Sequence, residues 1–148
     1  MIVTFCGHAD YNPSAHHEKT ILDLLEEKIG DRHAELYLGG YGSFDRFALL
    51  CGKRFQASHP NVKLIFISPY MPNDLEKNHL KQIVAAYDEI VYPPLERVPR
   101  RVAILRRNLW MVEHADLVVA YVIRSFGGAY QTLQHAQKCN KEIFELLP

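Results

Sequence analysis

The sequence predicts an α/β domain with a mostly parallel sheet of five or six strands and helices on both faces. Short apolar runs alternate with amphipathic stretches along the chain, as in strands joined by crossover helices. Two of these runs, 62–67 and 117–122, are apolar without alternation, which is typical of parallel strands covered on both faces. Three of the apolar runs are followed by loops that contain glycine.

The composition fits a single domain spanning residues 1–148, large enough to bury a hydrophobic core. Seventeen basic and 17 acidic residues give zero formal net charge, so overall charge gives no reason to expect nucleic acid or a membrane surface as a partner. We find no apolar run of membrane-spanning length and no signal-peptide pattern, and the three cysteines are widely spaced. We therefore expect a cytoplasmic protein without a disulfide framework.

The first half of the chain begins with a strand, a helix and a second strand. Residues 2–6 form the first apolar run, and Asn12 followed by Pro13 predicts a helix start. Gly30 is a natural stop for that helix, and 35–38 predicts the second strand. An amphipathic helix then follows, with apolar residues at helical spacing: Phe44, Phe47, Ala48, Cys51 and Phe55.

The second half predicts strands and helices in strict alternation. The expected strands and helices are, in order, 62–67, 80–87, 89–92, 102–112, 117–122, a helix from about 128, and 142–146 as a last edge strand. The helix at 102–112 carries several arginines. No linker or internal repeat interrupts the pattern, which supports one domain.

Each glycine-bearing loop lies at the carboxyl end of a predicted strand, after Cys6, Leu38 and Val122. In a parallel sheet these ends share one edge, and ligands bind outside that edge. A strand that leads through glycines into a helix presents backbone N–H groups and the positive end of the helix dipole to an anion. We therefore expect a phosphate-bearing ligand at this edge.

Six stretches of the chain carry a resemblance to a known superfamily: FCGHAD at 5–10, YLGGYGSFDRFA at 37–48, FISPYM at 66–71, YPPLE at 92–96, RNLWMVEHADLVVAY at 107–121 and GGAYQTLQ at 127–134. They resemble the SLOG superfamily of Rossmann-like nucleotide-binding domains, and within it small bacterial proteins of the YpsA/YoqJ kind. The resemblance implies a Rossmann-like three-layer α/β/α sandwich. It also allows a homodimer, which no sequence feature fixes.

The same superfamily contains the LOG-type phosphoribohydrolases, whose arginine and glutamate are implied to act on the bond between ribose and base. Arg107 stands nine residues before Asp116, as the arginine of those enzymes stands before the aspartate of an Ala-Asp pair. The glutamate position, counted from Gly127, is held by Gln134, which cannot exchange a proton. The resemblance therefore supports the pocket but not the hydrolase reaction, and the catalytic residues stay unassigned.

We predict that the chain binds a nucleotide or nucleotide-derived small molecule as a sensor or regulator, with no cofactor and no metal. An alternative is a nucleoside-monophosphate N-glycosidase that uses a non-standard acid, Asp45 or Asp10, and a third is a DNA-processing accessory protein. We do not expect nucleic acid or a membrane as a partner. The expected ligand-binding residues are Gly7, His8, Gly39, Gly40, Tyr41, Gly42, Ser43, Arg107, Gly127, Gly128 and Ala129.

Overall fold

The computed structural model describes residues 1–148 and contains a six-stranded sheet in the order β4-β3-β2-β1-β5-β6. Every neighbouring pair of strands is parallel, so the predicted α/β class is confirmed and the sheet is entirely parallel. The last predicted strand, β6, lies at an edge as expected. The strands are β1 (Ile2–Gly7), β2 (Ala34–Leu38), β3 (Val62–Ile67), β4 (Glu89–Val91), β5 (Leu117–Tyr121) and β6 (Glu142–Glu145).

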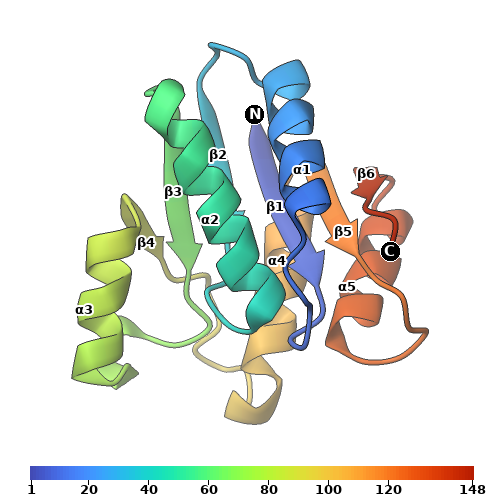
Figure 1. The fold of residues 1–148 in the computed structure, drawn as a ribbon. Coiled ribbons are helices and arrows are strands. Elements are labelled where there is room, and N and C mark those ends of the chain that lie inside the picture. The colour runs from blue at the N-terminus through green and yellow to red at the C-terminus, as the bar shows by residue number, and fades with distance from the viewer.

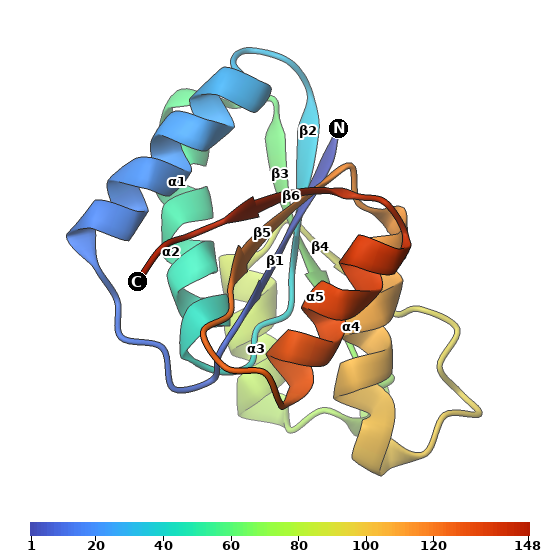
Figure 2. The ribbon, with the colours of Figure 1, turned by 90° about the vertical axis from the view of Figure 1, so that its right-hand side faces the viewer.

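Helices cover both faces of the sheet, which gives the Rossmann-like three-layer arrangement. Figure 2 shows α1 and α2 on one face and α4 and α5 on the other, while α3 lies beside the edge strand β4 (Figure 1). The helices are α1 (Ala15–Lys28), α2 (Ser43–Ser58), α3 (Lys77–Ala86), α4 (Ala103–His114) and α5 (Gly128–Lys138), with short 3₁₀ turns at Pro72–Asp74 and Arg100–Val102.

The direction in which strands are added reverses once, between β4 and β5. The first four strands extend the sheet one way, and the chain then returns through α4 to place β5 on the other side of β1. The two central strands pair from Val3 with Leu117 to Gly7 with Tyr121. Such a switch point leaves a crevice outside the carboxyl ends of the two strands, where ligands of parallel α/β sheets bind.

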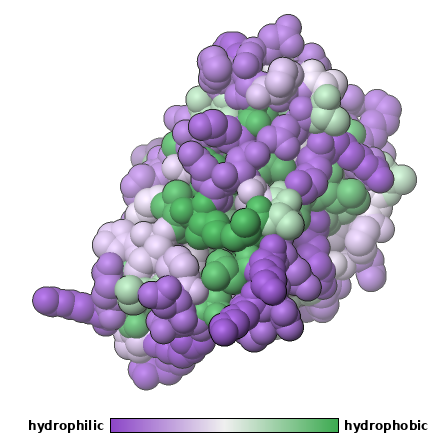
Figure 3. Space-filling view, turned by 90° about the vertical axis from the view of Figure 1, so that its left-hand side faces the viewer, coloured by the Kyte–Doolittle hydropathy of each residue, from purple (hydrophilic) through white to green (hydrophobic).

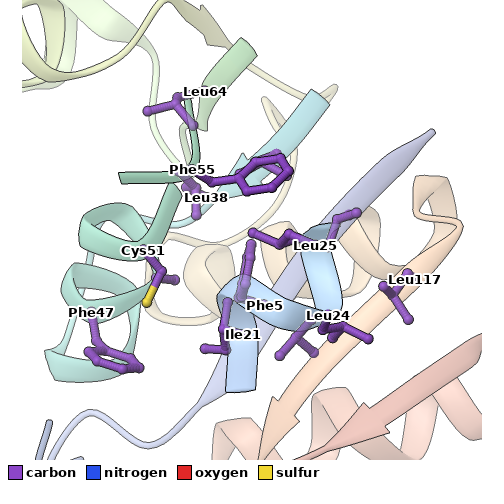
Figure 4. Close-up of a cluster of buried hydrophobic side chains, with 14 of the residues drawn as sticks. Phe5, Ile21, Leu24, Leu25, Leu38, Phe47, Cys51, Phe55, Leu64 and Leu117 are labelled. Atoms are coloured by element: carbon purple, nitrogen blue, oxygen red, sulfur yellow. The ribbon is translucent and has the colours of Figure 1, made fainter. Parts of the chain in front are cut away.

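The larger part of the hydrophobic core lies between the sheet and helices α1 and α2, where 20 buried residues pack together. Figure 4 shows this cluster, with side chains from β1, β5, α1 and α2: Phe5, Leu117, Ile21, Leu25 and Phe47. Smaller clusters fill the space under α4 and α5. Burial of one such side chain contributes roughly 1.5–3 kcal/mol. The loops at the carboxyl edge are therefore attached to a well-packed base.

The first helix starts later than predicted. Ser14, not Asn12, caps α1, and its Oγ accepts a hydrogen bond from the His17 N–H at 3.2 Å. Tyr11 is buried, and its hydroxyl hydrogen-bonds His17 Nδ1 at 2.8 Å. This anchor keeps the chain through Pro13 in the loop, and the helix begins only once a serine oxygen is in place to cap it.

The surface at the β4 edge carries exposed apolar residues. Figure 3 shows a band of hydrophobic residues across this side of the molecule, with hydrophilic residues around it. β4 has only three residues, and a short edge strand limits pairing with another chain. No helix of the structure combines the length and the apolar character that crossing a bilayer requires.

Candidate functional site

The three glycine-bearing loops meet at one edge of the sheet, below the arrowheads of β1 and β5 in Figure 1. A cavity of about 530 Å³ opens there, and residues from all three loops and from the first half of α4 line it. This volume lies within the usual range for small-molecule sites. The cavity coincides with the switch point between β1 and β5, so the fold and the loops define the same site.

Eight of the eleven predicted ligand-binding residues line this cavity: Gly7, His8, Tyr41, Gly42, Arg107, Gly127, Gly128 and Ala129. The other three, Gly39, Gly40 and Ser43, lie behind the lining. Gly40 packs against the Phe66 ring, where an added Cβ would come within 2.4 Å of a ring carbon. Ser43 donates its hydroxyl to the Tyr11 carbonyl oxygen at 2.5 Å. These three residues therefore shape the loop and do not face the cavity.

The N-terminus of α5 presents free backbone donors to the cavity. Its N-cap residue Gly127 has φ 91°, and no side chain caps the helix. The first helical bond runs from the Gln131 N–H to the Gly127 carbonyl at 3.0 Å, so the N–H groups of 128–130 have no acceptor within the helix. A Cβ added at Gly127 or Gly128 would meet nothing within 4 Å. An anion can therefore approach these groups without obstruction.

The glycine loop after β2 does not offer its amides in the same way. The Tyr41 N–H donates to Asp45 Oδ2 at 3.0 Å, and the Ser43 N–H donates to the Ala9 carbonyl at 2.9 Å. The Phe44 N–H points to the His8 carbonyl at 3.4 Å. Carbonyls of the first loop thus close the N-terminus of α2. Of the two glycine-opened helices at this edge, α5 alone is left open to a ligand.

Arg107 on α4 is a fully buried cation in the cavity lining. Its Nη1 donates to the carbonyl oxygens of Gly39 at 2.8 Å and Ile67 at 2.6 Å, and its Nε donates to Asn108 Oδ1 at 2.9 Å. These bonds tie α4 to the ends of β2 and β3. Its Nη2 has no partner, and a buried donor without an acceptor costs about 1–3 kcal/mol. A ligand acceptor at this position would remove that cost.

Asp45 lies close to Arg107 across Gly39. A Cβ added at Gly39 would stand 2.7 Å from Asp45 Oδ2 and 3.0 Å from Arg107 Nη2, so a glycine is needed between the two side chains. Burial raises the pKa of Asp45 to about 6, although the Arg107 charge and the Tyr41 N–H both act to lower it. A carboxyl group with a raised pKa beside a buried guanidinium in a cavity is typical of a functional site.

The free energy of unfolding of Asp45→Asn is expected to rise relative to that of the parent as pH rises. Because the folded-state pKa of Asp45 lies above its ordinary value of 3.8, the folded protein holds more of this proton than the unfolded chain between about pH 4 and 6. Stability from Asp45 is therefore present at low pH and lost as pH rises through about 6. Urea denaturation of both proteins from about pH 4 to 7 measures the difference in free energy of unfolding. If the parent instead became more stable relative to Asp45→Asn as pH rises, the raised pKa would be contradicted.

His8 and an ion pair connect the first loop to the loop after β5. His8 Nε2 accepts the Ile123 N–H at 3.0 Å, and burial together with the Arg124 charge lowers the pKa of His8. The ring is therefore neutral at pH 7, with its proton on Nδ1. Arg124 binds both carboxylate oxygens of Asp10, at 2.6 and 3.1 Å. These contacts hold the two loops together at the cavity.

Gln134 and Cys6 are not placed to act as an acid, a base or a nucleophile in the cavity. Gln134, at the position of the LOG-type glutamate, is exposed, lies outside the lining and donates to Tyr130 Oη at 3.0 Å. Cys6 lines the cavity, but burial raises the pKa of its thiol to about 12 and the thiol donates to the Ala129 carbonyl at 3.3 Å. The carboxyl groups that do line the cavity are those of Asp10 and Asp45. No three metal-ligating side chains gather anywhere in the structure.

Sequence reasoning missed five polar or aromatic lining residues: Phe5, Asn108, Arg124, Phe126 and Thr132. Phe5, Asn108 and Thr132 lie within stretches that carry the resemblance, so their motifs could have signalled them. Arg124 and Phe126 lie in the segment that lengthens the approach from β5 to Gly127. No spacing rule points to these two residues, and only the fold brings them to the cavity.

The fold and the cavity together define a Rossmann-like α/β domain with a ligand-sized crevice at its topological switch point. No family model matches the chain. The chain is similar to the uncharacterized SPbeta prophage-derived protein YoqJ of Bacillus subtilis (strain 168), with 25% identity over 136 residues that cover 80% of this chain and 78% of that protein. The predicted resemblance to YoqJ-like proteins is thereby confirmed.

Two solved structures of DNA processing protein A (DprA) share the fold. The protein from Streptococcus pneumoniae superposes with a TM-score of 0.69 at 13% identity, over 99% of this chain and 50% of that one. The Helicobacter pylori protein, described for its single-stranded DNA binding mode, superposes with a TM-score of 0.67 at 21% identity, over 100% of this chain and 66% of that one. This chain thus spans half to two thirds of the length of the DprA proteins.

The expectation that nucleic acid is not a partner is wrong. The Helicobacter pylori protein, which shares the fold of this chain, binds single-stranded DNA. Zero net charge was the basis of the expectation, but net charge averages over the whole surface and hides local clusters. Arg100, Arg101 and Arg106 form such a cluster at the start of α4, and none of them makes an ion pair within 4 Å.

Proposed function

We propose that this chain binds a nucleotide, or a small molecule derived from one, with a phosphate at the N-terminus of α5. One observation carries the proposal: the buried Arg107, whose Nη2 has no partner, lines the same cavity as the uncapped helix. The helix supplies backbone N–H groups and the guanidinium supplies positive charge, and a phosphate oxygen accepts from both kinds of donor. The open α5 terminus alone would be a weaker argument.

The charges of the cavity favour a ligand with a single phosphate. Arg107 and Arg124 line it together with Asp10 and Asp45, so the two signs are balanced in number. Arg124 is already paired with Asp10. A polyphosphate would meet two carboxylates without further cations. The position that corresponds to the LOG-type glutamate holds Gln134 and lies outside the cavity lining, so no carboxylate acts from there, which fits a sensor or regulator.

Isothermal titration calorimetry against AMP, GMP, CMP, UMP and ATP tests this function. We expect at least one monophosphate to bind with one site per chain and to bind more tightly than ATP. Circular dichroism before and after each titration confirms that the protein is folded. Folded protein that binds none of the nucleotides would contradict the proposal. Free base released during the incubations, detected by chromatography, would instead favour the N-glycosidase alternative with Asp45 as the acid.

A second candidate function is the binding of single-stranded DNA at the same edge. The arginine cluster at the start of α4 lies beyond the carboxyl edge of the sheet (Figure 1). The Arg100 guanidinium lies 4.2 Å from the centre of the Tyr70 ring, and paired cations and aromatic rings are the means by which single strands are bound without sequence preference. The shared fold with the Helicobacter pylori DprA supports this candidate.

Fluorescence anisotropy of a labelled thymidine oligonucleotide at several salt concentrations distinguishes the second candidate. If the cluster contacts phosphates, replacing Arg100, Arg101 and Arg106 with alanine should reduce the slope of log affinity against log salt by about 2. Arg32→Ala is the matched control, because Arg32 precedes β2 at the opposite edge of the sheet. An unchanged slope in the triple variant would exclude this surface.

A further inference from the structure

Phe126 is an exposed aromatic side chain directly beside the proposed phosphate site. It precedes the N-cap residue Gly127, lines the cavity and is 67% exposed. It belongs to none of the hydrophobic core clusters. A single exposed phenylalanine is common on protein surfaces, so the position of this ring carries the argument rather than its exposure.

The surroundings of Phe126 leave its ring accessible from the cavity. The next two residues are glycines, and a Cβ added at either would meet nothing within 4 Å. The two glycines therefore place no side chain of their own between the ring and the first turn of α5. The Arg124 guanidinium lies 5.8 Å from the ring centre and is held by its two bonds to Asp10. The ion pair thus holds a cation next to the ring, and the Phe126 side chain stays 67% exposed.

Two other aromatic rings that line the cavity pack against the protein itself. Tyr41 packs against Phe66, Tyr70 and His79, with ring centres 5.5–6.4 Å apart. Phe5 is buried in the core under α1 and α2. Among the aromatic side chains that line the cavity, Phe126 is the most exposed.

We propose that Phe126 is a stacking platform for the base of the ligand whose phosphate lies at the N-terminus of α5. This inference rests on the proposed nucleotide-binding function, and it explains why the site would select a ligand that carries a base. Stacking on an aromatic ring tolerates any base, because every base has a π face. The ligand class is therefore the nucleotides as a group, in preference to sugar phosphates or inorganic phosphate. Arg124 beside the ring adds a cation that attracts the stacked pair.

Calorimetry of Phe126→Ala against AMP and ribose 5-phosphate tests the platform. Loss of a base–aromatic stack should weaken AMP binding on the order of tenfold. Binding of ribose 5-phosphate should not change, because the donors of α5 and Arg107 are untouched. Phe126→Trp should bind AMP at least as tightly as the parent. Ile123→Ala is the matched control, since Ile123 is 57% exposed in the same loop but does not line the cavity.

The outcomes separate the platform from the function on which it rests. Equal AMP affinity in Phe126→Ala and the parent would overturn the platform while nucleotide binding stands. A parallel loss of AMP and ribose 5-phosphate would also overturn it, because the side chain would then act on the phosphate site. If the folded parent binds none of the nucleoside monophosphates, the proposed function fails and the platform fails with it.

Discussion

Replacing Arg107 with alanine is expected to lower the free energy of unfolding by about 3–5 kcal/mol and to abolish nucleotide binding. The change would leave the carbonyl oxygens of Gly39 and Ile67 without their donor, and both bonds are buried. It would also remove the positive charge that partly offsets the burial of Asp45. Urea denaturation followed by circular dichroism measures the loss of stability.

Two further variants keep this prediction informative even if Arg107→Ala does not fold. Arg107→Lys retains the charge but not the planar fork, so it should fold with reduced stability and bind more weakly than the parent. Arg106→Ala removes the neighbouring exposed arginine and should change stability by less than about 0.5 kcal/mol. If Arg107→Ala were as stable as Arg106→Ala, Arg107 would not be the structural link between α4 and the sheet.

Replacing Gly128 with aspartate is expected to abolish phosphate binding and to leave the fold intact. Gly128 is the first residue of α5, its φ is not positive, and an added Cβ would meet nothing within 4 Å. A carboxylate in the first turn of a helix stabilises that helix by about 0.3–1 kcal/mol. The same carboxylate would lie where we place the phosphate and would repel it. Stability and binding should therefore change in opposite directions.

Gly128→Ala is the control for this separation, because it adds the Cβ without the charge. It should retain most of the binding of the parent, measured by calorimetry, and should not melt at a lower temperature. Unchanged nucleotide affinity in Gly128→Asp would show that the phosphate binds away from α5. A large loss of stability in Gly128→Ala would show that the first turn of α5 is less open than the structure indicates.

The sheet could be predicted because each strand shows as an apolar run of consecutive residues. The apolar runs without alternation at 62–67 and 117–122 indicate parallel strands, and parallel strands bring their carboxyl ends to one edge. The meeting of the three loops follows from that rule alone. The start of α1 was misplaced because the choice between Asn12 and Ser14 as the cap depends on the distant packing of Tyr11.

The detailed site could not be predicted because its contacts join remote parts of the chain. Arg107 binds the carbonyl of Gly39, 68 residues earlier, and of Ile67, 40 residues earlier. The resemblance to LOG-type enzymes implied a ligand role for this arginine, but not its full burial or its unpartnered Nη2. Arg124 and Phe126 carried no signal at all, since their roles depend on the path of the loop after β5 and on the approach of Asp10.

A crystal structure with the tightest-binding nucleoside monophosphate tests the central claim most directly. The account predicts phosphate density within hydrogen-bonding distance of the backbone nitrogens of Gly128 and Ala129, with Arg107 Nη2 directed at the same ligand. Nucleotide density at any other surface, with the first turn of α5 facing only solvent, would contradict it.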